Sequence, residues 1–269
     1  MVSSVIAFPD LLRESRQSKG MSQLDLALLA GTTQRRVSFI ERGRERPGRD
    51  VVLRLAESLD LTLRERNAML LAAEYAPAFP ESSFEGAELA SLRRTLQEFC
   101  DAHALFPSMI TDANGFIVAQ NRAFSVFTRG CAPRLLEPPV HAVRIALHPE
   151  GMAPRIANFE VWAPRVLRSL ARSLQRKPDP RAAELLEELR GYVGDRPSHG
   201  QGSGFAIPLE YRTDFGVLQL IATYTQFPSA NDVTLMELRV ETFLPVDPAS
   251  HALLEKLHRL RTPDGTGPA

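Results

Sequence analysis

Apolar positions near the start of the chain recur at helical spacing and are interrupted by residues that begin or end helices. Ser22 is a favourable N-cap, because its hydroxyl can accept a hydrogen bond from a free backbone N–H of the first helical turn. Leu24, Ala27 and Leu28 then share one face, and Gly31 follows where a left-handed residue can end a helix. The pattern therefore predicts a short helix followed by a tight turn.

A second short helix is predicted after this turn, with Thr32 or Thr33 as its cap and with Val37 and Ile40 facing inward. Two short helices joined at a glycine form a helix-turn-helix, whose second helix can enter the major groove of DNA. The side chains that we expect on the outward face of this second helix are Gln34, Arg35, Arg36, Ser38 and Phe39.

Three more amphipathic helices are predicted beside this pair, over residues 10–19, 51–59 and 63–73. Asp10 and Asp50 are suitable caps for the first two of these helices. Their apolar faces are expected to form one core that holds the second helix of the pair still.

The pattern changes after residue 86, where apolar runs flank Asn114 and Gly115. Asn-Gly between two apolar runs is a strong hairpin signal, and Asn121 is expected to start a short helix after it. Helical spacing of apolar residues then predicts longer helices, which cover residues 87–104, 154–176, 180–193 and 248–260.

Three later segments show strict alternation of apolar and polar residues, which is typical of an antiparallel sheet with one buried face. The apolar rows are Phe205, Ile207, Leu209 and Tyr211; Leu218, Leu220, Ala222 and Tyr224; and Met236, Leu238, Val240 and Thr242. We therefore predict that the second part of the chain is an α+β domain.

The elements together predict two domains, an all-α five-helix helix-turn-helix domain over 1–76 and an α+β domain with an antiparallel sheet over 87–261. Residues 77–86 are rich in proline and serine, as linkers are. Residues 194–204 are expected to be a flexible loop, and residues 262–269 a disordered tail.

Residues 10–72 resemble the lambda-repressor/Cro (XRE) type of DNA-binding domain. The resemblance implies that the third of five helices reads bases, and that Gln23 lies at the groove edge or at a phosphate. The matching residues are Ser22, Gln23, Leu26, Ala27, Ala30, Gly31, Ser38, Ile40, Glu41, Gly43 and Pro47.

The distribution of charge supports a DNA-binding role, although the total does not. The chain has 269 residues, 44% of them hydrophobic, and a formal net charge of zero. Residues 34–49, however, hold six arginines against two glutamates, and such a patch can steer a protein to DNA.

Side-chain chemistry assigns different roles to the DNA-facing residues. Gln34 and Arg35 can read adenine and guanine through two hydrogen bonds each, and Phe39 can contact a thymine methyl group. Arg42, Arg44, Arg46 and Arg49 are either phosphate contacts or plain surface. The full set of expected DNA-binding residues is Gln23, Thr33, Gln34, Arg35, Arg36, Ser38, Phe39, Arg42 and Arg44.

The second part of the chain resembles the MmyB-like ligand-binding domain that follows XRE domains. The resemblance rests on residues 107–121, 143–162 and 232–245, and it implies a PAS-like fold with a cavity for an apolar ligand such as a fatty acid. Aromatic and aliphatic residues are candidates for the lining, or they simply fill a core. These candidates are Phe116, Val118, Phe124, Phe127, Trp162, Leu209, Tyr211, Leu218, Leu220, Ala222, Leu238 and Val240.

A mostly apolar pocket needs only a few polar groups to orient its ligand. Asn121, Arg144, His148 and Arg155 are the candidates, because an arginine can hold a carboxylate in a fork. His148 alternatively makes an ordinary hydrogen bond in its loop.

Motifs of other function classes are missing from the sequence. It contains no nucleophile elbow, P-loop, GxGxxG or zinc-ligand spacing, so we expect no enzyme, metal or cofactor. Cys100 and Cys131 do not make a disulfide framework and are expected to be reduced. No signal peptide or membrane span is recognisable, and a cytoplasmic location is expected.

We therefore expect a cytoplasmic transcriptional regulator that binds a DNA operator as a homodimer and senses a small apolar ligand. Three alternatives for the C-terminal domain remain open. It serves dimerisation alone, it grips a protein partner as in antitoxins, or it is a PAS-like sensor with haem or flavin.

Overall fold

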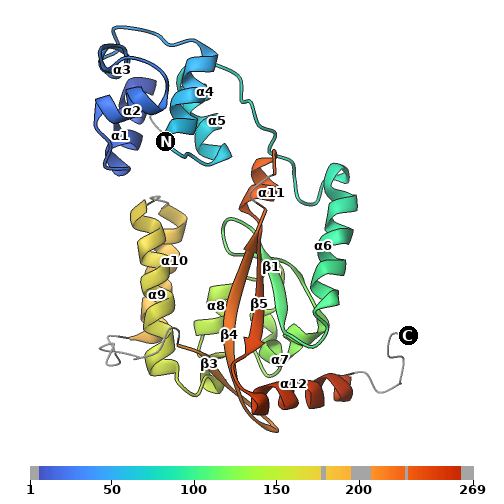
Figure 1. Ribbon diagram of the computed structural model, residues 1–269. Coiled ribbons are helices and arrows are strands. Elements are labelled where there is room, and N and C mark those ends of the chain that lie inside the picture. The colour runs from blue at the N-terminus through green and yellow to red at the C-terminus, as the bar shows by residue number, and fades with distance from the viewer. Residues whose placement is uncertain (1–5, 177–179, 195–206, 228–229, 262–269) are drawn as a thin grey trace. The chain divides into compact units, whose positions relative to one another are not determined.

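The computed structural model describes residues 6–176, 180–194, 207–227 and 230–261. The chain divides into two compact units (Figure 1). Residues 1–83 and 228–236 form the first unit, and residues 84–227 and 237–269 form the second. The predicted linker over 77–86 spans the first crossing between the units, and the predicted domain limits stay a prediction.

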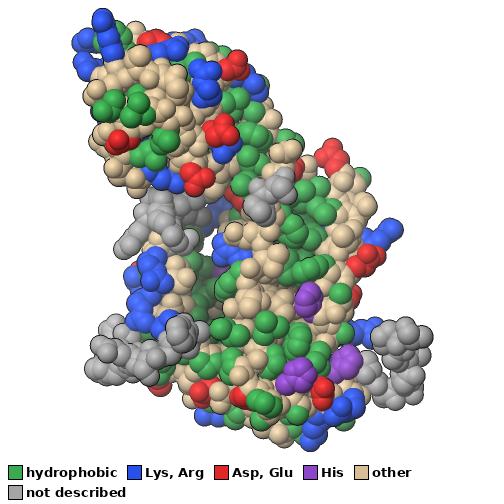
Figure 2. Space-filling model, viewed as in Figure 1, with side chains coloured by type: hydrophobic (Ala, Val, Ile, Leu, Met, Phe, Trp, Pro, Cys, Tyr) green, Lys and Arg blue, Asp and Glu red, His purple; other side chains and the backbone are tan. Residues whose placement is uncertain are grey.

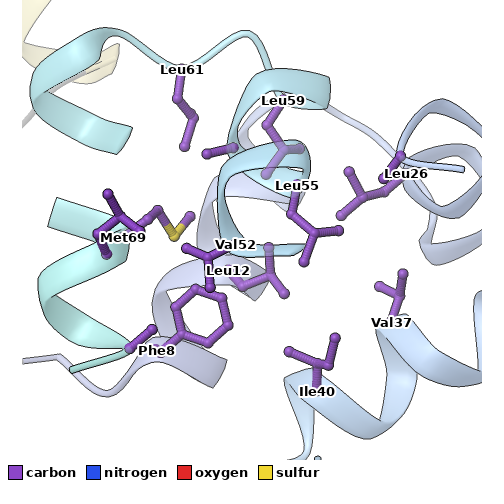
Figure 3. Close-up of a cluster of buried hydrophobic side chains, with 14 of the residues drawn as sticks. Phe8, Leu12, Leu26, Val37, Ile40, Val52, Leu55, Leu59, Leu61 and Met69 are labelled. Atoms are coloured by element: carbon purple, nitrogen blue, oxygen red, sulfur yellow. The ribbon is translucent and has the colours of Figure 1, made fainter. Parts of the chain in front are cut away.

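The first unit contains the five helices expected of a helix-turn-helix domain. Their apolar faces enclose a core in which Leu12, Leu26, Val37 and Ile40 are fully buried (Figure 3). Burying a side chain of this size contributes about 1.5–3 kcal/mol. The helices are α1 (Phe8–Ser18), α2 (Gln23–Leu29), α3 (Gln34–Glu41), α4 (Arg49–Ser58) and α5 (Leu63–Ala72).

The caps of the helix-turn-helix follow the prediction. The Ser22 hydroxyl accepts from the Asp25 N–H at 3.1 Å, and Asp25 Oδ2 accepts from the Ser22 N–H at 2.9 Å. Thr33 accepts from the N–H of Arg36 at 3.2 Å, and Gly31 adopts φ +62°, where a side chain would be strained. These local bonds set where α2 ends and α3 begins.

Two capping predictions are wrong. Helix α1 begins at Phe8 with Ala7 as its N-cap, and α4 begins at Arg49 with Gly48 as its N-cap. Asp10 and Asp50 therefore lie inside the first turns, where a carboxylate interacts favourably with the helix dipole instead of capping it.

The predicted apolar face of α2 is wrong at two of its three residues. Leu24 is 49% exposed and Leu28 is 71% exposed, whereas Ala27 is buried together with Leu26. Leucines on several sides of this short helix allow more than one apolar stripe. Packing against α3 and α4 selects the stripe that contains Leu26.

The second unit is built on a five-stranded antiparallel sheet with strand order β2-β1-β5-β4-β3. The predicted hairpin joins the first two strands, and its Asp112 Oδ1 accepts from the N–H groups of Asn114 and Phe116 at 2.9 and 2.8 Å. The strands are β1 (Ser108–Thr111), β2 (Ile117–Gln120), β3 (Leu209–Thr213), β4 (Gly216–Gln226) and β5 (Arg239–Pro245).

The predicted orientation of the last strand is wrong. Ala222 pairs with Phe243 and Leu220 pairs with Pro245, whereas Val240 pairs with Thr225. Directly paired residues lie on the same face of a sheet, so Val240 faces away from Leu220 and Ala222. The face of the sheet that carries Leu220, Ala222 and Phe243 is called the Leu220 face below. Leu238, which precedes β5, is buried but does not belong to the hydrophobic cluster on this face.

One helix packs on the β1–β2 end of the sheet and another on strands β4 and β5. Helix α6 (Ala90–Ala102) packs on β1 and β2, and α12 (Pro248–Arg261) packs on β4 and β5 (Figure 1). Helix α9 (Phe159–Arg176) packs against α10 (Pro180–Val193). The helix predicted over 154–176 therefore begins at Phe159 and not at residue 154. Ile156, which precedes it, forms a β-bridge with Tyr211 of β3.

The short helix expected to start at Asn121 is confirmed, because Asn121 caps a 3-10 turn over Arg122–Phe124 that continues into α7 (Ser125–Thr128). Two other short helices were not predicted, namely α8 (Ala142–Leu147) and α11 (Val233–Glu237). Met236 lies in α11 and not in a strand as predicted. Residues 195–204 of the predicted loop, Phe205 and the predicted tail over 262–269 lie outside the described residues. Within the part of the chain that the structure describes, no helix combines the length and apolar character needed to cross a membrane.

Candidate functional site

Helix α3 exposes most of the side chains that the sequence predicts as DNA contacts. Val37 and Ile40 anchor the helix in the core, and Gln34 and Arg35 on its other side are exposed. The Arg35 guanidinium lies 5.1 Å from the centre of the Phe39 ring, so the two side chains form one surface. Figure 2 shows basic side chains, in blue, around the end of the first unit that contains α3.

Three residues expected to face DNA have structural contacts within the unit. Ser38 is only 6% exposed, and its hydroxyl accepts a hydrogen bond from Arg42. Gln23 is half-buried and donates from Nε2 to Glu41 Oε2 at 2.8 Å. Thr33 uses its hydroxyl as the cap of α3. The prediction that Ser38 points outward is therefore wrong, because its side chain turns back toward Arg42.

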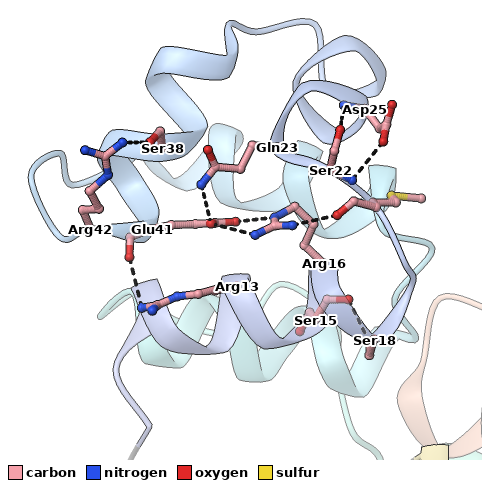
Figure 4. Close-up of polar contacts among 11 residues, drawn as sticks. Arg13, Ser15, Arg16, Ser18, Ser22, Gln23, Asp25, Ser38, Glu41 and Arg42 are labelled. Carbon is pink, nitrogen blue, oxygen red and sulfur yellow. Dashed lines mark hydrogen bonds and ion pairs between the residues drawn. The ribbon is translucent and has the colours of Figure 1, made fainter.

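Behind this surface lies a buried ion pair that the sequence did not reveal (Figure 4). Arg16 of α1 donates from Nε to Glu41 Oε1 at 2.7 Å and from Nη2 to Glu41 Oε2 at 3.0 Å, and Nη1 donates to the Met21 carbonyl at 2.6 Å. Hydrogen bonding to Glu41 raises the pKa of Arg16, although burial acts in the opposite direction. With Gln23, this network joins α1, α2 and α3.

The network fixes the orientation of α3 relative to the other two helices. The Arg16 and Glu41 side chains are only 10% and 3% exposed, so their charges are satisfied by each other and not by water. No local signal links residues 25 positions apart. The pair is recognisable only once the helices are packed.

The arginines of α3 and of the residues that follow it differ in their partners. Arg36 pairs with Glu45 and Arg46 pairs with Glu74, each at 2.7 Å. Arg44 and Arg49 are exposed, and no ion pair links them to any residue that the structure describes. Arg35 and Arg42 are likewise exposed and form no ion pair with a described residue, so all four have charge available for phosphates.

In the second unit, much of the expected ligand-lining set is packed core. Phe124, Leu209, Tyr211 and Leu220 are each 3% exposed or less and belong to one cluster with Phe127 and Leu218. The Tyr211 hydroxyl donates to the Phe127 carbonyl at 3.3 Å, and burial raises the pKa of Tyr211. These residues fill the inner part of the Leu220 face.

The outer part of this face is more open. Trp162 and Ala222, which pack against the cluster, are half-buried, and Tyr224, which follows Ala222 in the same row, is 60% exposed. Phe116 and Val118 are also half-buried but do not belong to the cluster. Phe116 also packs its ring against His141, with centroids 5.2 Å apart. The structure therefore separates the candidate residues into a filled inner group and a partly exposed outer group.

A carboxyl group that was not predicted lies in the outer part. Glu241 of β5 pairs with Tyr224 of β4 and is half-buried. Burial raises the pKa of Glu241 to about 7, while a hydrogen bond with the Tyr224 side chain and the charge of Arg239 act in the opposite direction. A glutamate within an alternating strand gives no sequence signal that it faces inward.

The four polar candidates do not come together. Asn121 donates from Nδ2 to the carbonyls of Cys100, His103 and Phe106, and its Oδ1 accepts from two N–H groups. Arg144 forms a two-bond pair with Glu188 at 2.7 and 2.8 Å. Each side chain has a structural partner and holds two segments of chain together.

The other two polar candidates differ from each other. His148 Nδ1 accepts from the N–H of Glu150 at 3.0 Å, which is the ordinary loop role. Arg155 pairs with Asp214 at 3.2 Å and lines a small cavity of about 130 Å³. Of the four, Arg155 alone is placed on the wall of this cavity.

Metal and thiol chemistry has little support among the residues that the structure describes. No three histidine, cysteine, aspartate or glutamate side chains of the described residues are grouped as a metal site would require. Cys100 and Cys131 are both free thiols, and burial raises the pKa of Cys100 to about 11. A thiol with a raised pKa is a poor nucleophile at neutral pH.

Comparison with known proteins identifies both units. Residues 92–257 match the model of the MmyB-like transcription regulator ligand binding domain. The chain belongs to this family. Residues 12–66 match a helix-turn-helix model, so this MmyB-like protein is a transcription regulator with a DNA-binding domain of the XRE type.

Among solved structures, the chain is similar to the restriction-modification controller protein C.AhdI from Aeromonas hydrophila. The sequence identity is 39%, the match covers 23% of this chain and 94% of that chain, and the TM-score is 0.22. No curated protein matches the chain.

Proposed function

We propose that this MmyB-like regulator binds a two-fold symmetric DNA operator as a homodimer, and that a small, mostly apolar ligand such as a fatty acid controls that binding. The observation that carries the DNA part is the outward surface of α3, where Gln34, Arg35 and Phe39 are held above a buried ion pair. A rigid helix of this chemistry suits direct reading of bases in the major groove.

The proposed DNA contacts fall into two groups. Gln34, Arg35 and Phe39 read bases, and Arg44 contacts phosphate, since it is exposed. Gln23, Thr33, Ser38 and Arg42 act by positioning, because their polar groups already hold α3 and the residues after it. Arg36 is held by Glu45 and contributes to the phosphate-facing edge.

The proposed ligand site is the outer part of the Leu220 face, around Trp162 and Ala222. The support is their partial exposure beside a core that is otherwise filled. A ligand there changes DNA affinity only if it binds two arrangements of the dimer differently. A regulator of this kind acts in the cytoplasm, where DNA is, and needs neither catalysis nor a membrane.

Selection of operators from a random duplex library with the full chain, followed by titration against salt, tests the DNA assignment. Arg35→Ala should cost about 1–3 kcal/mol at the selected operator and relax specificity at one position, because it removes a two-bond base contact. Arg44→Ala should weaken all sequences alike and reduce the salt slope by about one.

Arg94→Ala is the matched control, because Arg94 is an exposed arginine on α6 in the other unit. It should leave both specificity and salt slope unchanged. If Arg35→Ala and Arg44→Ala lower specific and non-specific binding by equal factors, α3 is not the reading helix.

A further inference from the structure

Helix α9 carries a row of arginines on the side that faces away from its neighbours. The part of α9 that follows Glu160 contains four arginines and no acidic residue. The structure describes the side chains of Arg165, Arg168 and Arg172, and all three are exposed. These three residues are called the α9 stripe below. Figure 2 shows basic side chains, in blue, along this helix.

The spacing of the α9 stripe places its members on one face of the helix. They occupy positions i, i+3 and i+7, which fall within one narrow row because an α-helix has 3.6 residues per turn. The apolar side of α9 lies opposite, where Ala163, Val166 and Leu170 pack in a cluster with Leu189 and Val193 of α10. This packing directs the α9 stripe to solvent over a length of about 10.5 Å.

The charge of the α9 stripe is not neutralised within the part of the chain that the structure describes. Its three guanidinium groups form no ion pair with a described residue. Two glutamates of the neighbouring α10 have other partners. Glu187 pairs with Arg190. Glu188 accepts from Arg144 and Tyr192. Three positive charges are therefore available to an anionic partner.

The chemistry and the length of the α9 stripe both suit the phosphate backbone of DNA. Guanidinium groups donate paired, charge-assisted hydrogen bonds to phosphate oxygens. Duplex DNA carries one negative charge per about 1.7 Å of its axis, so the stripe is as long as about six phosphates. Contacts to phosphates carry no sequence information, and they therefore add affinity without changing which bases are read.

A membrane surface is a poorer match for this helix. A helix that lies on a membrane buries an apolar face at the boundary between head groups and acyl chains. The apolar side of α9 is already packed against Leu189 of α10 and Leu147 of α8. Only the arginine side is left for a partner, and this favours a polyanion over a lipid surface.

We propose that the α9 stripe is a second DNA contact of this regulator, and that it binds phosphates of the duplex that flanks the bases read by α3. This inference rests on the DNA binding proposed for the first unit. Because both surfaces belong to one chain, a duplex held by α3 is presented to the α9 stripe at a high effective concentration. Phosphate contacts that are weak alone thus add to the affinity for the operator.

Fluorescence anisotropy of the full chain with two duplexes tests the proposal. The short duplex ends at the operator selected from the random library, and the long duplex adds about 20 base pairs on each side, roughly 70 Å of helix. The affinity for the long duplex should fall more steeply with salt. If each arginine of the stripe contacts one phosphate, the logarithmic slope should be steeper by about 2.7 per chain.

A triple variant identifies the stripe as the source of this difference. Arg165→Gln/Arg168→Gln/Arg172→Gln should remove the extra slope and weaken binding to the long duplex at least about tenfold at about 0.1 M salt, with the short duplex unaffected. Replacement of the same three residues by lysine should retain most of the slope, because a lysine also binds phosphate as a point charge. If circular dichroism shows that the glutamine variant is unfolded, Arg168→Gln alone should remove about 0.9 of the slope.

The matched control is Arg94→Gln/Arg122→Gln/Arg212→Gln. These three arginines are exposed on other elements of the second unit, so the control changes the net charge by the same amount. It should leave binding to both duplexes unchanged. An equal loss of slope in this control would mean that total charge and not the α9 stripe is responsible, and would overturn the proposal.

The outcomes separate this inference from the proposed function. If the glutamine variant has the wild-type salt slope on the long duplex, the α9 stripe does not contact DNA, although reading by α3 still stands on the short duplex. If the wild type does not prefer the selected operator, the proposed function itself fails. Flotation with phosphatidylglycerol vesicles tests the membrane reading. Vesicle binding that the glutamine variant loses, with unchanged slopes on DNA, would assign the stripe to a lipid surface instead.

Discussion

Breaking the buried pair between Arg16 and Glu41 should destabilise the helix-turn-helix unit while leaving the stability of the second unit unchanged. Glu41→Gln keeps the shape of the side chain but removes the charge that faces Arg16. The Arg16 guanidinium then loses its counter-charge while it remains 10% exposed. Removing one partner of a buried ion pair costs about 3–5 kcal/mol, because an uncompensated charge stays inside.

The structure places this change at the lower end of that range. Arg16 keeps its bond to the Met21 carbonyl at 2.6 Å, and the new amide can still accept one hydrogen bond. A loss of about 3 kcal/mol lowers the melting temperature of a domain this small by roughly 12 °C or more. Asp10→Asn is the control, since its pair with Arg13 is exposed and contributes about 1 kcal/mol or less.

The assay separates the two units through the tryptophan. Trp162 is the sole tryptophan of the chain and lies in the second unit, so its fluorescence follows that unit. The helical circular dichroism signal follows the unfolding of both units, because both contain helices. Glu41→Gln should split off an early dichroism transition, with the tryptophan transition unmoved.

A double variant makes the argument sharper. The double variant Arg16→Met/Glu41→Leu should lower the free energy of unfolding by much less than the sum of the two single variants, because it leaves no unpaired charge buried. If Glu41→Gln melts within a few degrees of the wild type, or if the double loss equals the sum, the pair does not hold α3 as we describe.

Two further predictions concern the sheet. Glu241, with a pKa of about 7, holds its proton in the folded state over a range where the unfolded chain releases it near 4.5, so the stability of the second unit should fall as pH rises from about 4.5 to 7. Glu241→Gln should flatten this slope in urea titrations followed by Trp162, and an unchanged slope would contradict the raised pKa. Ala222→Phe, at a half-buried position opposite Phe243, should leave the unit near wild-type stability and abolish any thermal shift produced by a fatty acid. A loss of about 1–3 kcal/mol in this variant, with no lipid shifting the wild type, would indicate a packed core and favour dimerisation as the role of the domain.

The sequence was informative where a structural choice depends on residues a few positions apart. Ser22, Asp25, Gly31 and Thr33 decide where α2 and α3 begin and end, and their bonds span three residues or fewer. The Asn-Gly hairpin is local in the same way. For this reason the helix-turn-helix, the hairpin and the α+β character of the second unit were all predictable.

Tertiary structure decided the features that depend on distant residues or on a choice between equivalent faces. Leu24, Leu26 and Leu28 are chemically alike, and only the positions of α3 and α4 select Leu26 for the core. The pairing register of β5 turned Val240 away from Ala222, because a shift of one residue exchanges the faces of a strand. Packing of α1 against α3 brought Arg16 to Glu41, 25 positions away in the chain, and burial then gave this ion pair its energetic weight.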